Sequence, residues 1–292
     1  SSKNQTVIFI LFFGALFSLS VFAAPAYVDV KVMTFNVRVP VDPHPNDWAS
    51  RKPLVFAGIK DQAPDFLGVQ EALPEVLADI NSEFTKYAQV GRGRNQDGGG
   101  EGTQIFYKKS DWLIDPTDQG TFQLSPTPDV PGSNGWQMQF PRIFTWARFI
   151  EKKSGNAIYV FNTHFPLTPQ ERNLSVKLLA KHIAERKWKN EPVILTGDLN
   201  AVESEDSIKY ISGEGGSPIS MKDAYRSLYP DKTVGTFHGF GKEKDARKVD
   251  YIFFQGEAKV LSAEILENKE ADQNYASDHY PVVAKIRLIG KK

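Results

Sequence analysis

Apolar and polar positions along the chain follow two different periods. Short stretches rich in β-branched and apolar residues predict strands at residues 28–37, 65–69, 103–107, 145–151, 157–163, 193–196, 249–254, 259–265 and 282–288. Longer stretches between them have the period of helices. The alternation predicts an α/β (α+β) fold, and no shift in composition marks a second domain.

Three segments are expected to be helical. One covers residues 48–62. A second is indicated by the stripe Leu73, Val76, Leu77, Ile80 and Phe84, because positions three and four apart share one helix face. The third begins with a capping box formed by Thr168, Pro169 and Glu171 and is predicted to extend to about residue 189.

Two segments are predicted to be loops. Residues 95–102 carry four glycines and are expected to be a loop, and the glycine-rich stretch around residues 91–102 is expected to form a flexible rim of a site. Residues 124–141 are rich in proline, glycine and serine without any period, which indicates a surface excursion. Trp136 and Phe140 lie in this excursion and are the only candidates for a membrane-dipping tip.

Composition narrows the function classes. The 292 residues are 41% hydrophobic and 24% charged, which is ordinary for a globular protein. The 35 basic and 35 acidic side chains cancel, so no overall positive field favours nucleic acid. Cysteine is absent, which excludes disulfides, thiolate metal sites and cysteine nucleophiles.

The first residues resemble a secretory signal peptide. Lys3 precedes an apolar run over residues 7–22, and the run ends in the pattern Val21-Phe22-Ala23. We expect a signal peptide at residues 1–23, one mature domain at 24–292, and a secreted or periplasmic protein without stable membrane insertion. The alternative is a membrane anchor, for which the run is shorter than the ~20 residues a spanning helix needs.

Polar residues of catalytic type recur at the ends of the predicted strands, where open α/β architectures place their sites. Each could be a turn former, but their number favours a shared site. They are Asn36, Glu71, Glu101, His164, Asp198, Asn200, Asp250, Asp278 and His279.

This ordered series resembles the endonuclease/exonuclease/phosphatase superfamily over about residues 30–288. The leader makes the chain similar to secreted bacterial-type members. The resemblance implies a deoxyribonuclease-I-like sandwich of four layers, in which two mixed sheets pack face to face with helices outside. It also implies a metal-dependent hydrolase of phosphoester bonds.

The resemblance implies a role for each polar residue. Glu71 and Asn36, with Asp278 nearby, would hold Mg²⁺ or Mn²⁺, since hard cations prefer oxygen ligands. His279 would contact the phosphate or act as acid or base, with Asp250 accepting its other ring proton. Glu101 would do the same for His164.

Asp198 and Asn200 alternate in sequence, so in an extended segment both side chains would point to the same side. The carboxylate would then take a proton from water while the amide holds the water or a phosphate oxygen.

Four further residues are candidates for substrate binding. Arg92, Arg94 and Arg142 would hold a second anionic group, or they are solvated surface arginines. His238 lies between aromatic residues and forms either a substrate wall or a packed turn. His44 and His182 are better read as structural residues.

Three functions stay open. The neutral charge favours a phosphatase or phosphodiesterase acting on a small molecule, a sugar phosphate or a lipid headgroup. An extracellular nuclease is the alternative, and the segment 242–248 is the only basic cluster that would support it. The third is a binding protein on the same scaffold.

Overall fold

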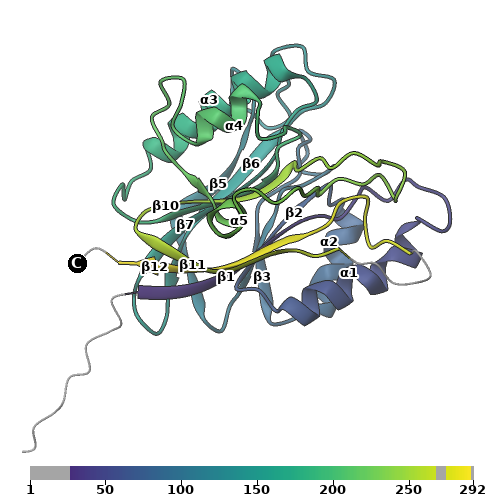
Figure 1. Cartoon of the computed structure of the whole chain (residues 1–292), viewed down its shortest axis with the longest axis horizontal. Helices are drawn as coiled ribbons and strands as arrows, with labels where there is room; N and C mark the ends of the chain where they lie inside the picture. Colours follow the sequence, from purple (N-terminus) through teal and green to yellow (C-terminus); the bar gives the residue numbers. More distant parts are fainter. Residues whose placement is uncertain (1–26, 268–273, 291–292) are drawn as a thin grey trace, which may run out of the picture.

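Two six-stranded mixed sheets form the centre of the molecule (Figure 1). The computed structural model describes residues 27–267 and 274–290, so the predicted signal peptide lies outside the described residues. The first sheet has the order β11 (Ala258–Ile265), β12 (Val282–Ile289), β1 (Tyr27–Asn36), β2 (Phe66–Gln70), β4 (Ile105–Lys108) and β3 (Tyr87–Val90). The second has the order β5 (Trp112–Gln123), β6 (Ile143–Glu151), β7 (Ala157–His164), β8 (Val193–Asp198), β10 (Asp250–Gln255) and β9 (Lys222–Asp223).

The sheets pack face to face because their central strands are apolar on both sides. In β1, Val30 and Val32 join the core between the sheets, whereas Met33 and Phe35 belong to the core under the helices. Successive side chains of a strand point to opposite faces, so one strand serves two cores. The expected four-layer sandwich is confirmed.

Helices cover the outer face of each sheet (Figure 1). Helices α1 (Trp48–Gln62) and α2 (Pro74–Glu83) pack on the first sheet, and α3 (Pro169–Ala184) and α4 (Asp206–Ile211) pack on the second. The short α5 spans Ala224–Leu228. Within the part of the chain that is described, no helix has both the length and the apolarity to cross a membrane.

The third helix begins as predicted and ends earlier. The Thr168 side chain accepts a hydrogen bond from the backbone N–H of Glu171, as a capping hydroxyl should. The helix ends at Ala184 rather than near residue 189. Arg186 donates to the carbonyl of Ile183 in the last turn and to the carbonyls of Lys189 and Glu191 in the following loop, so its guanidinium satisfies one helix-end group and holds the loop against the helix.

Three strands, β3, β5 and β9, were not predicted. All three lie at sheet edges and are paired on one side only. Most β5 residues are half-buried or exposed, and its pairing with β6 shifts register between Ile114 and Gln119. An edge strand with an irregular register carries little of the alternation by which a strand is recognised.

A buried polar layer joins the two sheets below the strand ends. Asn162 donates to the carbonyls of Val69 and Gln104, and it accepts from Gln70 and Thr196. Gly68 faces this layer, where an added Cβ would come within 2.7 Å of the Asn162 side chain. These bonds fix the register of one sheet on the other directly under the site.

Candidate active site

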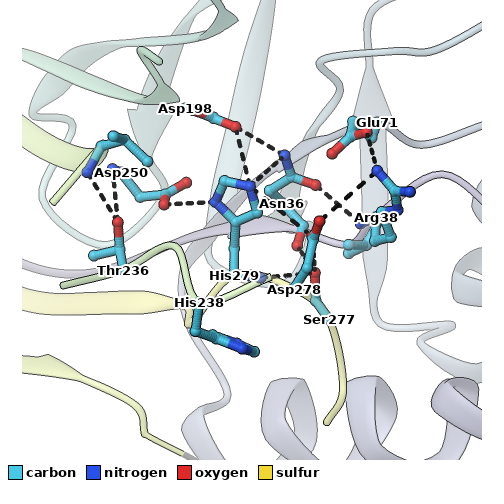
Figure 2. Close-up of polar contacts among 12 residues, drawn as sticks. Asn36, Arg38, Glu71, Asp198, Thr236, His238, Asp250, Ser277, Asp278 and His279 are labelled. Carbon is cyan, nitrogen blue, oxygen red and sulfur yellow. Dashed lines mark hydrogen bonds and ion pairs between the residues drawn. The ribbon is translucent and has the colours of Figure 1, made fainter. Parts of the chain in front are cut away.

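The polar residues converge because the pairing of the strands brings their ends to one edge. His164 and Asp198 are paired at the ends of the parallel strands β7 and β8. Asp250 opens the antiparallel strand β10 opposite Asp198. Asn36 closes β1, and Asp278 and His279 lie just before β12, which starts beside the end of β1. Residues far apart in sequence therefore meet across both sheets (Figure 2).

The carboxylate of Asp198 is the centre of this cluster. Its Oδ2 accepts from Asn36 Nδ2 at 2.9 Å and lies 3.3 Å from His164 Nε2 and 3.5 Å from His279 Nε2. Burial opposes ionisation, but the attraction of His279 and His164 is stronger and holds the pKa of Asp198 below its usual range. Asp198 is therefore a carboxylate, and its hydrogen bond to Asn36 links the two sheets.

His279 lies between two carboxylates. Its Nδ1 is 2.8 Å from Asp250 Oδ2, and its other ring nitrogen faces Asp198. Burial disfavours the charged imidazole, but the two negative charges outweigh burial and raise the pKa of His279 well above its ordinary value. The imidazolium is the favoured form in this arrangement.

Glu71 and Asp278 form the second half of the site. Glu71 follows β2 in a left-handed conformation with φ of 58°, which turns its side chain toward Asp278. Burial raises the pKa of Glu71, and the negative charge of Asp278 adds to the effect. Ligand atoms of Glu71, Asp278 and His279 all lie within 4.8 Å of one another.

The donor set fits a divalent cation. Two carboxylates with like charge lie close together in a nearly buried position, with side-chain exposures of 12% and 10%. No hydrogen bond to either carboxylate comes from a basic side chain among the described residues, and Arg38 Nη1 lies 3.9 Å and 3.7 Å away. A hard cation coordinated by oxygen would neutralise the pair. The side-chain oxygen of Asn36 accepts a hydrogen bond from the backbone N–H of Arg38, the residue whose guanidinium faces both carboxylates.

His164 is oriented by Arg142, not by Glu101. Arg142 Nη1 lies 2.9 Å from His164 Nδ1. Since a guanidinium only donates, Nδ1 must accept, and the ring proton is on Nε2, which faces Asp198. The expectation that Glu101 accepts a proton from His164 is wrong, because Glu101 is paired with Arg94 at 2.5 Å.

The glycine-rich loop brings Glu101 to the same small cleft as His164 but pairs it with Arg94. Backbone hydrogen bonds from Gly93 to Gly98 and from Arg94 to Glu101 close the loop into a hairpin. Gly102 then donates to the carbonyl of Ala72, next to Glu71. The loop does border the site, as predicted, but as a hydrogen-bonded hairpin and not as an open flexible rim.

The arginines predicted to bind substrate have different positions. Arg94 and Arg142 line a small cleft together with Glu71 and His164. Arg92 does not, because its guanidinium donates to Gln123 and to the carbonyls of Gly93 and Thr121. Arg92 therefore attaches the glycine-rich loop to β5.

His238 forms a packed turn. Its ring lies between those of Tyr275 and Tyr280, at centroid distances of 4.5 Å and 4.2 Å. Burial lowers the pKa of His238 to about 4, so the ring is neutral at physiological pH. Its backbone N–H donates to the carbonyl of Asp278. His238 thus supports the backbone of Asp278 and does not form a substrate wall.

Asn200 does not extend the strand of Asp198. Strand β8 ends at Asp198, and Asn200 has a φ of 47°. Its amide donates to the carbonyl of Phe165, and its backbone N–H donates to Asp198 Oδ1. The expectation that both side chains point to one side of an extended segment is wrong, because the chain turns here.

Two arginines near the site were not found from the sequence. Arg51 on α1 is 1% exposed and donates to the carbonyls of Val37 and Ala276, which ties the loops after β1 and before His279 together. Arg38 follows Asn36 by two residues and faces the carboxylates of Glu71 and Asp278. Only its nearness to Asn36 in sequence could have signalled it.

The two packed sheets gather carboxylates, amides and imidazoles at one shared edge. This combination of fold and site is typical of phosphoester hydrolases. The chain belongs to the endonuclease/exonuclease/phosphatase family, whose model matches residues 33–279. The members of this family are phosphoesterases, and divalent metal dependence is general among them.

Three relatives show the breadth of this similarity. A family member from Bacteroides vulgatus is 33% identical with a TM-score of 0.79, and the match covers 89% of this chain and 99% of that one. A mannosyl-6-phosphatase from Bacteroides thetaiotaomicron is 28% identical with a TM-score of 0.77, covering 88% and 99%. The uncharacterized protein L388 of Acanthamoeba polyphaga mimivirus is 25% identical over 257 residues, 81% of this chain and 91% of that protein.

Proposed function

We propose that the protein is a Mg²⁺- or Mn²⁺-dependent phosphatase or phosphodiesterase that acts on a small phosphorylated molecule, with sugar phosphates as the first class to test. The observation that carries the proposal is the convergence on Asp198 of two imidazoles and one amide, beside the carboxylate pair of Glu71 and Asp278. This arrangement offers groups for water activation, for charge stabilisation and for a metal ion.

Glu71 and Asp278 would hold the metal, with the side-chain oxygen of Asn36 next to them. When bound, a divalent cation supplies Lewis acidity toward the phosphoryl group. Asn36 also donates to Asp198, so the same side chain would position the metal ligands and the acid–base residue. A cation held by the two carboxylates would bind the phosphate on the same side of the cluster.

The remaining residues would accept or donate protons and hydrogen bonds. Asp198 is ionised, as a group that accepts a proton from an attacking water must be. His279, protonated by its position between Asp250 and Asp198, would donate a hydrogen bond or a proton to a phosphate oxygen. His164 presents its Nε2 proton to the same space, and Arg142 fixes that tautomer.

The surface supports a small substrate better than nucleic acid. Net charge is zero, and the only predicted basic cluster loses a member because Lys248 is buried on Asp223 at 2.6 Å. The mannosyl-6-phosphatase similarity also supports a sugar phosphate. Trp136 packs against the core under α3, which leaves Phe140 alone of the two candidates for a membrane-dipping tip and makes a bulk lipid substrate the poorer choice.

Hydrolysis of a substrate panel tests the proposal, read as phosphate release for the monoesters, p-nitrophenol release for the diester and strand nicking for DNA. The purified chain is assayed with mannose 6-phosphate, glucose 6-phosphate, phosphocholine, bis-p-nitrophenyl phosphate and plasmid DNA, each with Mn²⁺ and with chelator. We expect metal-dependent turnover of a sugar phosphate and its loss in Asp198→Asn. Nicking of DNA without turnover of small esters would favour the nuclease, and inactivity on every substrate would favour the binding protein.

We also propose that the protein is exported. The support is the apolar run over residues 7–22 that ends in Val21-Phe22-Ala23. Expression in a Gram-negative host followed by N-terminal sequencing of the periplasmic fraction tests it. A mature chain that begins near Ala24 is expected, whereas an uncut chain in the membrane fraction would favour an anchor.

A further inference from the structure

Arg38 directs its guanidinium at the two carboxylates that are proposed to hold the metal (Figure 2). Its Nη1 lies 3.9 Å from Glu71 Oε1 and 3.7 Å from Asp278 Oδ2. Both distances are too long for good hydrogen bonds but short for charges that are largely removed from water. The interaction is therefore one of charge, and both carboxylates experience it about equally.

The guanidinium is fixed in this position. Arg38 Nε and Nη2 donate to the two carboxylate oxygens of Asp42 at 2.8 Å and 2.9 Å. The backbone N–H of Arg38 donates to Asn36 Oδ1, and its carbonyl accepts from Arg51 Nη2. Since a bidentate pair holds a guanidinium in one plane, Arg38 neither reaches the carboxylates nor swings away from them.

We propose that Arg38 is a fixed counter-cation of the metal site, which stabilises Glu71 and Asp278 when metal is absent and weakens the binding of the divalent ion. The inference rests on the proposed function, because it takes these two carboxylates as metal ligands. A cation held between them would be repelled by the guanidinium that faces both. The same charge reduces the repulsion between the carboxylates in the metal-free protein.

The test measures Mn²⁺ affinity by calorimetric titration of chelator-stripped protein, without substrate and at low salt. Arg38→Gln should bind Mn²⁺ about tenfold more tightly, because it removes a positive charge a few ångströms away at an effective dielectric between those of protein surface and water. Its melting temperature in chelator should fall. Arg38→Lys keeps the charge and should bind Mn²⁺ with nearly the affinity of the unmodified protein.

Arg287→Gln is the matched control. Arg287 also makes a bidentate pair with an aspartate, Asp29, at 2.8 Å and 2.9 Å. Asp29 is seven residues before Asn36 on β1, which puts the pair roughly 20 Å from the site. The control therefore loses the same charge and the same hydrogen bonds, and its Mn²⁺ affinity should not change.

A second variant predicts the opposite sign. Asp42→Asn keeps the positive charge of Arg38 but removes the anchor and one negative charge, so Mn²⁺ binding should weaken. Unchanged or weaker affinity in Arg38→Gln, or tighter affinity in Asp42→Asn, would overturn the inference. Failure of the unmodified protein to bind Mn²⁺ would overturn it as well. If the enzyme is active and metal-dependent but both variants bind Mn²⁺ with unchanged affinity, this inference is refuted and the proposed function stands.

Discussion

His279 and Asp250 are 29 residues apart in sequence, and Nδ1 of one lies 2.8 Å from Oδ2 of the other, with both side chains nearly excluded from solvent. The contact crosses from the loop before β12 to the first residue of β10, and so from one sheet to the other. A charge-assisted hydrogen bond of this length fixes the orientation of the His279 ring and favours its protonated form.

Replacing Asp250 by Asn should lower turnover about 10²-fold to 10⁴-fold, in the range of acid–base catalysis. The amide keeps the shape but removes the charge that raises the pKa of His279. Steady-state kinetics and a thermal melt on the same preparation check this. Asp245→Asn, in an exposed loop, is the control and should keep full activity. Full activity in Asp250→Asn would show that His279 does not have the proposed role in proton transfer.

Replacing Glu71 by Gln should weaken Mn²⁺ binding and abolish most of the turnover at low metal concentration. The reason is that one of the two carboxylates facing the proposed cation loses its charge. Activity is measured against Mn²⁺ concentration after removal of metal by chelator. Glu75→Gln, an exposed position in the first turn of α2, should leave the metal dependence unchanged. Chelator-resistant activity in the unmodified protein would contradict the role of Glu71.

Arg142→Gln should lower kcat/KM, because His164 loses the donor that keeps its Nδ1 unprotonated. We expect a decrease of roughly 10-fold to 10²-fold, since the variant removes a positioning group and not the imidazole itself. The pH profile of kcat/KM should also change shape. Arg92→Gln is the matched control, because Arg92 bonds to Gln123 and does not line the cleft. Equal losses in both variants would indicate a general effect of charge.

The sequence predicted the central elements because they are apolar with a clear period. It also predicted the residues that end parallel strands, such as Asn36, His164 and Asp198, since strand direction alone brings these ends together. Edge strand β5 was missed because its residues are mostly half-buried or exposed.

Contacts that depend on turns were not predictable. Whether Glu101 or Arg142 faces His164 depends on how the glycine-rich hairpin folds back. Asn200 leaves the strand direction through a left-handed backbone conformation, and Arg38 faces the carboxylates from another. Local spacing carries no information about such turns when several backbone conformations suit the same residues.

Asn162→Ala should destabilise the protein by about 2–4 kcal/mol, since it leaves several buried polar partners unsatisfied. The Asn162 amide makes bonds to Val69, Gln104, Gln70 and Thr196 and is fully buried. Chemical denaturation measures the change. Asn134→Ala, which removes a single bond to the carbonyl of Met138 in a surface loop, should cost about 1 kcal/mol or less. Similar losses in the two variants would show that the polar layer does not hold the sheets together.

The stability of the protein should fall as pH decreases below about 6.5, and His182 should contribute to the fall. Its ring packs on Phe122, Phe144 and Trp146, and burial lowers the pKa of His182. The unfolded chain then binds a proton at a higher pH than the folded one does. Protonation consequently favours unfolding from the unfolded pKa downward, and the loss is complete below the folded pKa.

Melting temperatures between pH 7.5 and 5 measure this effect. His182→Leu places an apolar side chain against the aromatic rings, and leucine cannot be protonated. The melting temperature of this variant should therefore decrease less over this range. His44→Gln is the control, because the His44 side chain is 83% exposed and its loss should leave the pH dependence of the unmodified protein. A parallel decrease in melting temperature in all three proteins would show that groups other than His182 cause the loss of stability at low pH. A smaller decrease in His182→Leu alone would establish His182 as a structural histidine of the helix–sheet core.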